Sequence, residues 1–336
     1  MRSEASSDVL KVWLYAAASV LLGAWFAPLL YNAGKALAEV SSSKQTNGML
    51  ELIAGFCRNA NFSVFFEWSI LLFAGLLLMP LTAALRGGRA IESHTKSVLH
   101  LQERAMEGQR LLPNPHWLRQ WLIGFLMMSV CFLLINVALF FAGIFAWENP
   151  NERIVTLVWR GFILAFASAT FQEILFRGIA MGIFLRAMRP SAALGLSSLL
   201  YATVHFLQVP PSLSVVDPDA AGVGFEMLWK IAERFADGRS VFGTFVPLLA
   251  SGFIFAHARW RTASLWLPIG LHAGWIFSSN LLGSLTIVAG RQGVNPWEIS
   301  GISIRQGIVI LFGIILVGLL TNYLTKNSHV SINRDD

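Results

Sequence analysis

The stretch Thr170-Phe171-Gln172-Glu173-Ile174-Leu175-Phe176-Arg177-Gly178 lies inside an apolar run that extends from about Ile154 to Met188. Glu173 and Arg177 are four residues apart, so on a helix they lie on one face, one turn from each other. A carboxylate or a guanidinium left unpaired at membrane depth costs on the order of 2.5–3.5 kcal/mol. Both are tolerated there if they neutralise each other and face the protein interior. The pair therefore indicates either a functional site or a structural ion pair that locks helix packing.

The composition of the chain is that of a membrane protein. Of its 336 residues, 55% are hydrophobic and 13% are charged, whereas charged residues make up about 25% of a typical soluble protein. The formal net charge of +6 does not indicate nucleic-acid binding, because Lys and Arg fall mainly in alternate short connections, as the positive-inside rule requires. Cys57 and Cys131 are the only cysteines, so neither a disulfide framework nor a cysteine metal site is predicted.

Long apolar runs separated by polar connections predict an all-α polytopic membrane protein with about eight transmembrane helices. The expected spans are 9–31, 65–85, 117–147, 154–188, 190–208, 241–258, 263–282 and 302–324. The fourth is too long for one straight span, so we expect it to be tilted or broken. The basic connections at 86–119, 186–189 and 259–261 then fall on one side of the membrane, which predicts that both termini are cytoplasmic.

The same pattern divides the chain into three ranges. Residues 1–153 are expected to hold the N-terminal transmembrane helices and, at about 87–116, a cytoplasmic amphipathic segment on the membrane surface. Residues 154–282 form the core that carries the polar intramembrane residues. Residues 283–336 hold a final loop, the last transmembrane helix and a cytoplasmic tail.

Two histidines lie within apolar helices, on spans other than the one that carries Glu173. They are His205 in the fifth span and His272 in the seventh. A lone intramembrane histidine is most simply a hydrogen-bonded packing residue, but two of them with a Glu–Arg pair indicate a polar site enclosed by spans four, five and seven. A carboxylate and two imidazoles can activate water for attack on a carbonyl carbon without any cofactor. The same groups are Zn²⁺ ligands, but the HExxH pattern is absent, so a Zn²⁺ site of Glu173, His205 and His272 ranks below direct water activation.

Three short patterns follow one another along the chain, namely Gln172-Glu173-Ile174-Leu175-Phe176-Arg177-Gly178, Tyr201-x-x-x-His205 and His272-x-x-x-Ile276. In the same order they resemble the Glu-Glu-x-x-x-Arg, Phe-x-x-x-His and His-x-x-x-Asn/Asp motifs of the CAAX endopeptidase and bacteriocin-processing family (CPBP, ABI) of intramembrane proteases. The resemblance covers roughly residues 155–282. It implies a glutamate-type intramembrane endopeptidase in the bacterial inner (plasma) membrane, acting on a membrane-associated peptide or protein.

The resemblance also implies catalytic roles for five residues, namely Glu173, His205, His272, Arg177 and Gln172. In the family the first Glu of the first motif is held to activate water. Here that position is Gln172, whose amide can orient water but has no useful basicity. Glu173 is then expected to take the proton together with His205, in addition to pairing with Arg177.

The third motif departs from the family pattern at its last position. The polar residue that the family is held to use for stabilising the oxyanion is replaced by Ile276. Asn280 lies two turns beyond His272 on a similar helix face, about 12 Å along the axis. Loss of one oxyanion donor typically costs about 10²–10³ in rate.

Three functions therefore stay open. The first is an intramembrane endopeptidase in which Glu173 and His205 activate water. The second is a catalytically impaired family member that binds a hydrophobic peptide or a partner membrane protein. The third is a proton-coupled transporter that uses Glu173, Arg177 and the histidines as a relay, ranked last because no repeat is visible in the chain. The expected partners are the lipid bilayer and a membrane-associated peptide or protein, and no nucleic acid is expected.

Overall fold

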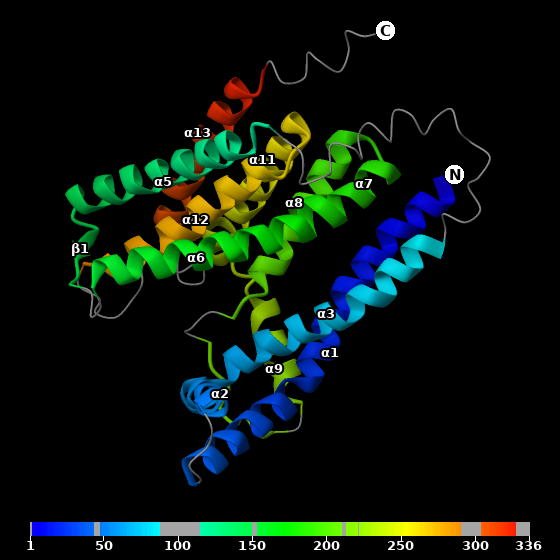
Figure 1. Cartoon of the computed structure of the whole chain (residues 1–336), viewed down its shortest axis with the longest axis vertical. Coiled ribbons are helices and arrows are strands. Elements are labelled where there is room, and N and C mark those ends of the chain that lie inside the picture. Colours follow the sequence, from blue (N-terminus) through cyan, green and yellow to red (C-terminus); the bar gives the residue numbers. More distant parts are fainter. Residues whose placement is uncertain are drawn as a thin grey trace. The chain divides into compact units, whose positions relative to one another are not determined.

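The computed structural model describes residues 2–43, 48–87, 115–149, 153–209, 213–220, 222–289 and 304–326. These residues are almost entirely helical, which confirms the predicted all-α membrane class (Figure 1). The amphipathic segment predicted at about 87–116 lies mostly outside the described residues, as do most of the final loop and the tail. The chain forms two compact units, residues 1–93 with 207–237 and residues 94–206 with 238–336. The three consecutive ranges set out from the sequence stay a prediction.

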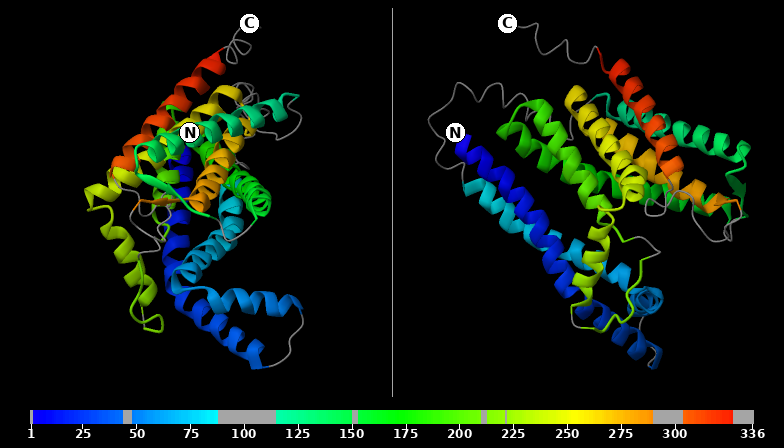
Figure 2. Two further views of the ribbon diagram at one scale, coloured as in Figure 1. Left: turned by 90° about the vertical axis from the view of Figure 1, so that its left-hand side faces the viewer. Right: turned by 180° about the vertical axis from the view of Figure 1, so that it is seen from behind.

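The first unit contains the helices α1 (Arg2–Ser43), α2 (Gly48–Asn59), α3 (Phe62–Gly87) and α9 (Val223–Glu233). Figures 1 and 2 show α1 and α3 side by side, and α2 and α9 also pack against α1. The first span was predicted to end at Tyr31, but α1 continues to Ser43. One reason is Lys35, whose Nζ atom donates to the carbonyl oxygens of Cys57, Arg58 and Ala60 at 3.1, 3.0 and 2.8 Å. The polar side of α1 thus satisfies the end of α2, where helical carbonyls lack partners.

The second unit contains the elements α5 (Trp117–Phe141), β1 (Phe145–Trp147), α6 (Ile154–Glu173), η1 (Ile174–Ala180), α7 (Met181–Ala187), α8 (Pro190–Phe206), α10 (Gly238–Ser240), η2 (Val241–Phe245), α11 (Val246–Thr262), α12 (Trp266–Leu285), β2 (Thr286–Val288) and α13 (Ile304–Leu324). The central helix is α12, which packs against α5, α6 and α11 (Figure 1). α11 in turn packs against α8 and α13. The short strands β1 and β2 pair antiparallel, with Phe145 opposite Val288, and this ribbon was not predicted.

Six helical segments among the described residues are long and apolar enough to cross a membrane, namely Ser7–Ser42, Phe62–Leu81, Trp117–Phe141, Ile154–Ala187, Gly238–Thr262 and Gly307–Leu324. They correspond to six of the eight predicted spans. The other two predicted spans are α8, which has only 17 residues, and α12, whose apolar character is reduced by His272, Asn280 and several serines. Membrane crossing by these two helices stays a prediction. They are the helices that carry His205 and His272.

Glycines bring α12 very close to α5. A Cβ atom on Gly270 would lie 2.2 Å from the carbonyl oxygen of Trp121, and one on Gly274 would lie 2.6 Å from that of Phe125. Small residues allow the backbones of membrane helices to approach in this way. His272 lies between the two glycines in sequence, so the close contact with α5 holds the backbone from which His272 projects.

We expect Gly270→Ala to destabilise the protein by about 1–3 kcal/mol, because the added methyl group forces α12 away from α5. The matched control is Gly195→Ala in α8, where a Cβ atom would meet no heavy atom of the described residues within 4 Å. That variant should be neutral or stabilising by up to about 1 kcal/mol, because alanine favours a helix over glycine. Unfolding of the purified variants in detergent measures both effects. Equal stability of the two variants would contradict the close packing of α5 and α12.

Candidate functional site

The long element predicted at 154–188 is helical throughout but contains a π-helix at its polar residues. α6 ends at Glu173, η1 is a π-helix of 7 residues, and α7 continues to Ala187. π-helical turns are rare and are often found at functional sites. Glu173 is 0% exposed, and Arg177, within η1, is 1% exposed. The element thus carries two fully buried charges where its backbone departs from the α-helix.

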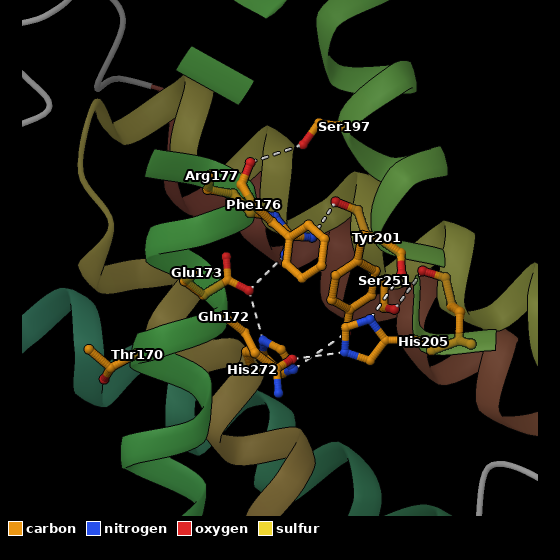
Figure 3. Close-up of polar contacts among 12 residues, drawn as sticks. Thr170, Gln172, Glu173, Phe176, Arg177, Ser197, Tyr201, His205, Ser251 and His272 are labelled. Carbon is orange, nitrogen blue, oxygen red and sulfur yellow. Dashed lines mark hydrogen bonds and ion pairs between the residues drawn. The ribbon is translucent and has the colours of Figure 1, made fainter. Parts of the chain in front are cut away.

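Glu173 is the centre of the buried polar cluster. The Nη1 atom of Arg177 donates to Glu173 Oε1 at 2.8 Å, so the ion pair expected from the spacing is present. His272 Nδ1 lies 2.7 Å from the same oxygen (Figure 3). A carboxylate accepts hydrogen bonds, so Nδ1 of His272 carries the proton. The other oxygen, Oε2, is buried and has no hydrogen-bond partner among the described residues. One carboxylate oxygen is therefore held by two donors, and the other is buried without a hydrogen-bond partner among the described residues.

Arg177 is held by aromatic rings and by α11 as well as by Glu173. Its Nη2 atom donates to the carbonyl oxygen of Gly252 at 3.0 Å. Its guanidinium carbon lies 4.4 Å from the centre of the Tyr201 ring and 5.2 Å from that of Phe255. Cation–π contacts of this kind stabilise a desolvated guanidinium. Arg177 is thus a fixed cation that orients Glu173.

A second polar pair is formed by Gln172 and His205. His205 Nδ1 lies 2.9 Å from the carbonyl oxygen of Tyr201, one turn earlier in α8. A carbonyl oxygen only accepts, so the proton of the imidazole is on Nδ1. His205 Nε2 lies 2.8 Å from the Gln172 amide oxygen. In a neutral imidazole this nitrogen accepts, so the bond requires Gln172 to present its NH₂ group, which has the same shape as its oxygen. A carboxylate in that place could only accept a hydrogen bond, so it would require a proton on His205 Nε2.

The structure brings all five predicted residues together in the second unit (Figure 3). Gln172, Glu173 and Arg177 come from α6 and η1, His205 from α8 and His272 from α12. The ring centres of the two histidines are 6.1 Å apart. The catalytic roles of these residues stay predictions.

Sequence reasoning missed the contribution of α11. Besides the Gly252 carbonyl, α11 provides Phe255, whose ring stacks on His272 at 5.1 Å between centres. A Cβ atom on Gly252 would lie 3.0 Å from Cδ1 of Tyr201, so α11 approaches α8 tightly at this glycine. The small pair Ser251-Gly252 within the apolar run 241–258 was the available signal, because small residues mark close helix contacts in membranes.

The third motif does not supply an oxyanion donor. Ile276 is partly buried, and Asn280 is exposed. Asn280 therefore does not replace the missing polar residue within the buried cluster. The reason is the rise of α12, which carries position 280 about 12 Å along the helix from His272.

A metal site is not evident in the part of the chain that the structure describes. No group of three or more His, Cys, Asp or Glu side chains there is placed to hold a metal ion. His272 Nδ1 faces Glu173, and His205 Nε2 faces Gln172, so the three ligands considered for Zn²⁺ do not point at a common centre. Activity without a metal stays a prediction.

Comparison with known proteins identifies the segment that carries the site. Residues 154–278 match the model of a family described as type II CAAX prenyl endopeptidase, Rce1-like. The match includes all five predicted site residues and confirms the family resemblance that the three motifs indicated. Comparisons with curated proteins and with solved structures gave no match.

Proposed function

We propose that the protein is an intramembrane endopeptidase. The proposal rests on residues 154–278, which match the Rce1-like type II CAAX prenyl endopeptidase family. The substrate is a membrane-associated peptide or protein, and the reaction is hydrolysis of a peptide bond by activated water. The apolar helices and the family domain support an integral membrane protein with protease chemistry.

The unpartnered oxygen of Glu173 is the observation that carries the proposal. Oε1 is held by Arg177 and His272 at 2.8 and 2.7 Å, while Oε2 is buried with no partner among the described residues. A water bound to Oε2 gives its proton to the carboxylate as its oxygen attacks the carbonyl carbon of the substrate. When the C–N bond breaks, the protonated Glu173 returns that proton to the leaving amine. General-base catalysis of this kind contributes about 10²–10⁴ in rate.

Gln172 supplies the hydrogen-bond donor that the third motif lacks. One of its two amide hydrogens bonds His205 Nε2 across the 2.8 Å contact, and the second is available to the oxygen that becomes negative in the tetrahedral intermediate. An amide donor in such a place is typically worth about 10²–10³ in rate. In this proposal Gln172 is the oxyanion donor. The glutamine at 172 thus takes the role of the polar residue that is missing at 276.

A second candidate function is binding without cleavage. Gln172 occupies the position of the first carboxylate in the first family motif. Ile276 occupies the position of the polar residue that ends the third motif. A protein impaired in this way would keep the buried cluster and bind a hydrophobic peptide or a partner membrane helix. The two candidates differ in one measurement, which is cleavage by the wild-type protein.

The test is an assay of the purified protein in lipid vesicles against a library of membrane-associated peptides, with products detected by mass spectrometry. We expect wild-type protein to cleave a subset of them, and a chelator to leave the rate unchanged. Binding of peptides without any cleavage would favour the second candidate. Loss of cleavage on chelation, restored by Zn²⁺, would contradict the proposal that Glu173 activates water unaided.

The proposal places both termini on the cytoplasmic side of a bacterial inner membrane, and cysteine labelling tests this orientation. Asp217 and Arg189 are both exposed, and the native Cys57 and Cys131 are buried. In intact cells a membrane-impermeant maleimide should label Asp217→Cys but not Arg189→Cys. Labelling of Arg189→Cys should require permeabilisation of the inner membrane. The reverse pattern would overturn the orientation.

A further inference from the structure

We infer that Tyr201 is a positioning residue of this site, which sets the protonated nitrogen of both histidines. Its hydroxyl group bonds His272, and its backbone carbonyl bonds His205. The effect of Tyr201 on rate rests on the proposed function, whereas its effect on the histidines does not.

The side chain of Tyr201 extends a row of three groups. The Tyr201 hydroxyl oxygen lies 3.4 Å from His272 Nε2, and His272 Nδ1 lies 2.7 Å from Glu173 Oε1. Phenol, imidazole and carboxylate thus follow one another, all of them buried (Figure 3). Arg177 closes the arrangement, because it bonds Glu173 and also lies over the Tyr201 ring at 4.4 Å. The phenol is therefore held in place by a contact with the same ion pair that it helps to orient.

The hydroxyl group stabilises the form of His272 that the Glu173 carboxylate requires. With the proton on Nδ1, the lone pair of His272 is on Nε2, which faces the phenol. The Tyr201 O–H donates to that lone pair, so both nitrogens are satisfied. In the other tautomer Nδ1 and the Glu173 carboxylate would face each other as two acceptors. The 3.4 Å contact is at the long end for a hydrogen bond, and such bonds at active sites commonly shorten when substrate binds.

The backbone of Tyr201 has the same effect on the second histidine. Its carbonyl oxygen receives the Nδ1 hydrogen of His205 at 2.9 Å, which leaves Nε2 to face Gln172. A single residue of α8 thus connects the Glu173–His272 pair with the Gln172–His205 pair. Replacing Tyr201 with phenylalanine distinguishes the two contacts. It removes the hydroxyl group that contacts His272 and keeps the backbone carbonyl that contacts His205.

The experiment compares the wild-type protein with Tyr201→Phe, using ¹⁵N-labelled histidine and NMR of the full chain in detergent. Signals of His272 are identified by their loss in His272→Asn. In Tyr201→Phe the His272 Nε2 signal should move toward the value of a nitrogen that receives no hydrogen bond, and the His205 signals should be kept. We expect kcat to fall roughly 5–30-fold, the factor that corresponds to loss of one hydrogen bond, with KM little changed.

Tyr15→Phe is the matched control, because the Tyr15 hydroxyl donates to the carbonyl oxygen of Ala74 at 2.7 Å in the first unit. It should leave the histidine signals and kcat unchanged. Should Tyr201→Phe not fold, the wild-type protein still carries the test, because its His272 should be protonated on Nδ1 and its Nε2 signal should be that of a nitrogen that accepts a hydrogen bond. Unchanged His272 signals in Tyr201→Phe, or a wild-type His272 protonated on Nε2 instead, would overturn the inference. Shifted signals in a protein that cleaves no peptide would uphold it and contradict the proposed peptidase.

Discussion

Replacing Glu173 with glutamine should lower kcat for peptide cleavage by about 10²–10⁴, because the amide cannot take a proton from water. The carboxylate is 0% exposed, and its Oε2 is the oxygen without a hydrogen-bond partner among the described residues. Single-turnover cleavage by the purified variant in lipid vesicles measures the effect.

The matched control is Glu226→Gln in α9. Glu226 also forms an ion pair with a residue four positions later, Lys230 at 2.7 Å, but on the surface of the first unit. The Glu226→Gln variant should cleave peptide at the wild-type rate. Cleavage by Glu173→Gln at the wild-type rate would refute Glu173 as the base.

Gln172→Glu separates the two candidate functions in the same assay. If Gln172 is an oxyanion donor, the new carboxylate has no hydrogen to give while ionised, and cleavage should fall about 10²–10³-fold. If the wild-type protein is impaired because it lacks a carboxylate at 172, it should be inert and Gln172→Glu should gain activity. A gain of activity would therefore favour the second candidate.

Replacing Arg177 with methionine should destabilise the protein by about 3–5 kcal/mol, because it leaves the buried Glu173 charge without its cationic partner. Methionine also loses the hydrogen bond of Arg177 to the Gly252 carbonyl, so a double variant is needed to isolate the effect of the charge. Unfolding in detergent, followed by circular dichroism, measures it.

Two further variants make this result specific. Lys230→Met breaks the surface pair with Glu226 and should cost only about 0.3–0.5 kcal/mol. The double variant Glu173→Gln/Arg177→Met removes both charges and should be more stable than Arg177→Met alone. Equal stability of Arg177→Met and Lys230→Met would show that Arg177 is hydrated and does not neutralise Glu173.

Much of the site was predictable because its parts are local in sequence. The ion pair of Glu173 and Arg177 follows from a four-residue spacing on one helix, and the structure shows it at 2.8 Å. Six of the eight predicted spans correspond to helices of membrane-spanning length and composition. The family followed from three short motifs in order, and residues 154–278 match it. Each of these inferences uses only composition or spacing along one segment.

The errors of prediction concern residues whose partners are distant in sequence. Asn280, on a similar face of the helix to His272, is exposed and does not replace the polar residue at 276 within the buried cluster. The first span was ended too early, since Lys35 finds its partners more than 20 residues later, at the end of α2. The ribbon of β1 and β2 joins residues 145–147 to 286–288, and no local pattern indicated it.

The sequence by itself determined that the chain is a helical membrane protein, that residues 154–278 carry the motifs of a protease family, and that Glu173 pairs with Arg177, because a helix repeats every 3.6 residues wherever it lies. Only the tertiary structure decided that His272 shares Glu173 Oε1 with Arg177, that Gln172 meets His205, and that Tyr201 contacts His272. These contacts depend on how each helix is rotated about its axis, and that rotation is set by packing such as the approach of Gly270 to Trp121 and of Gly252 to Tyr201. No spacing within one segment contains that information, because the rotation of each helix is fixed jointly by all the helices that it touches.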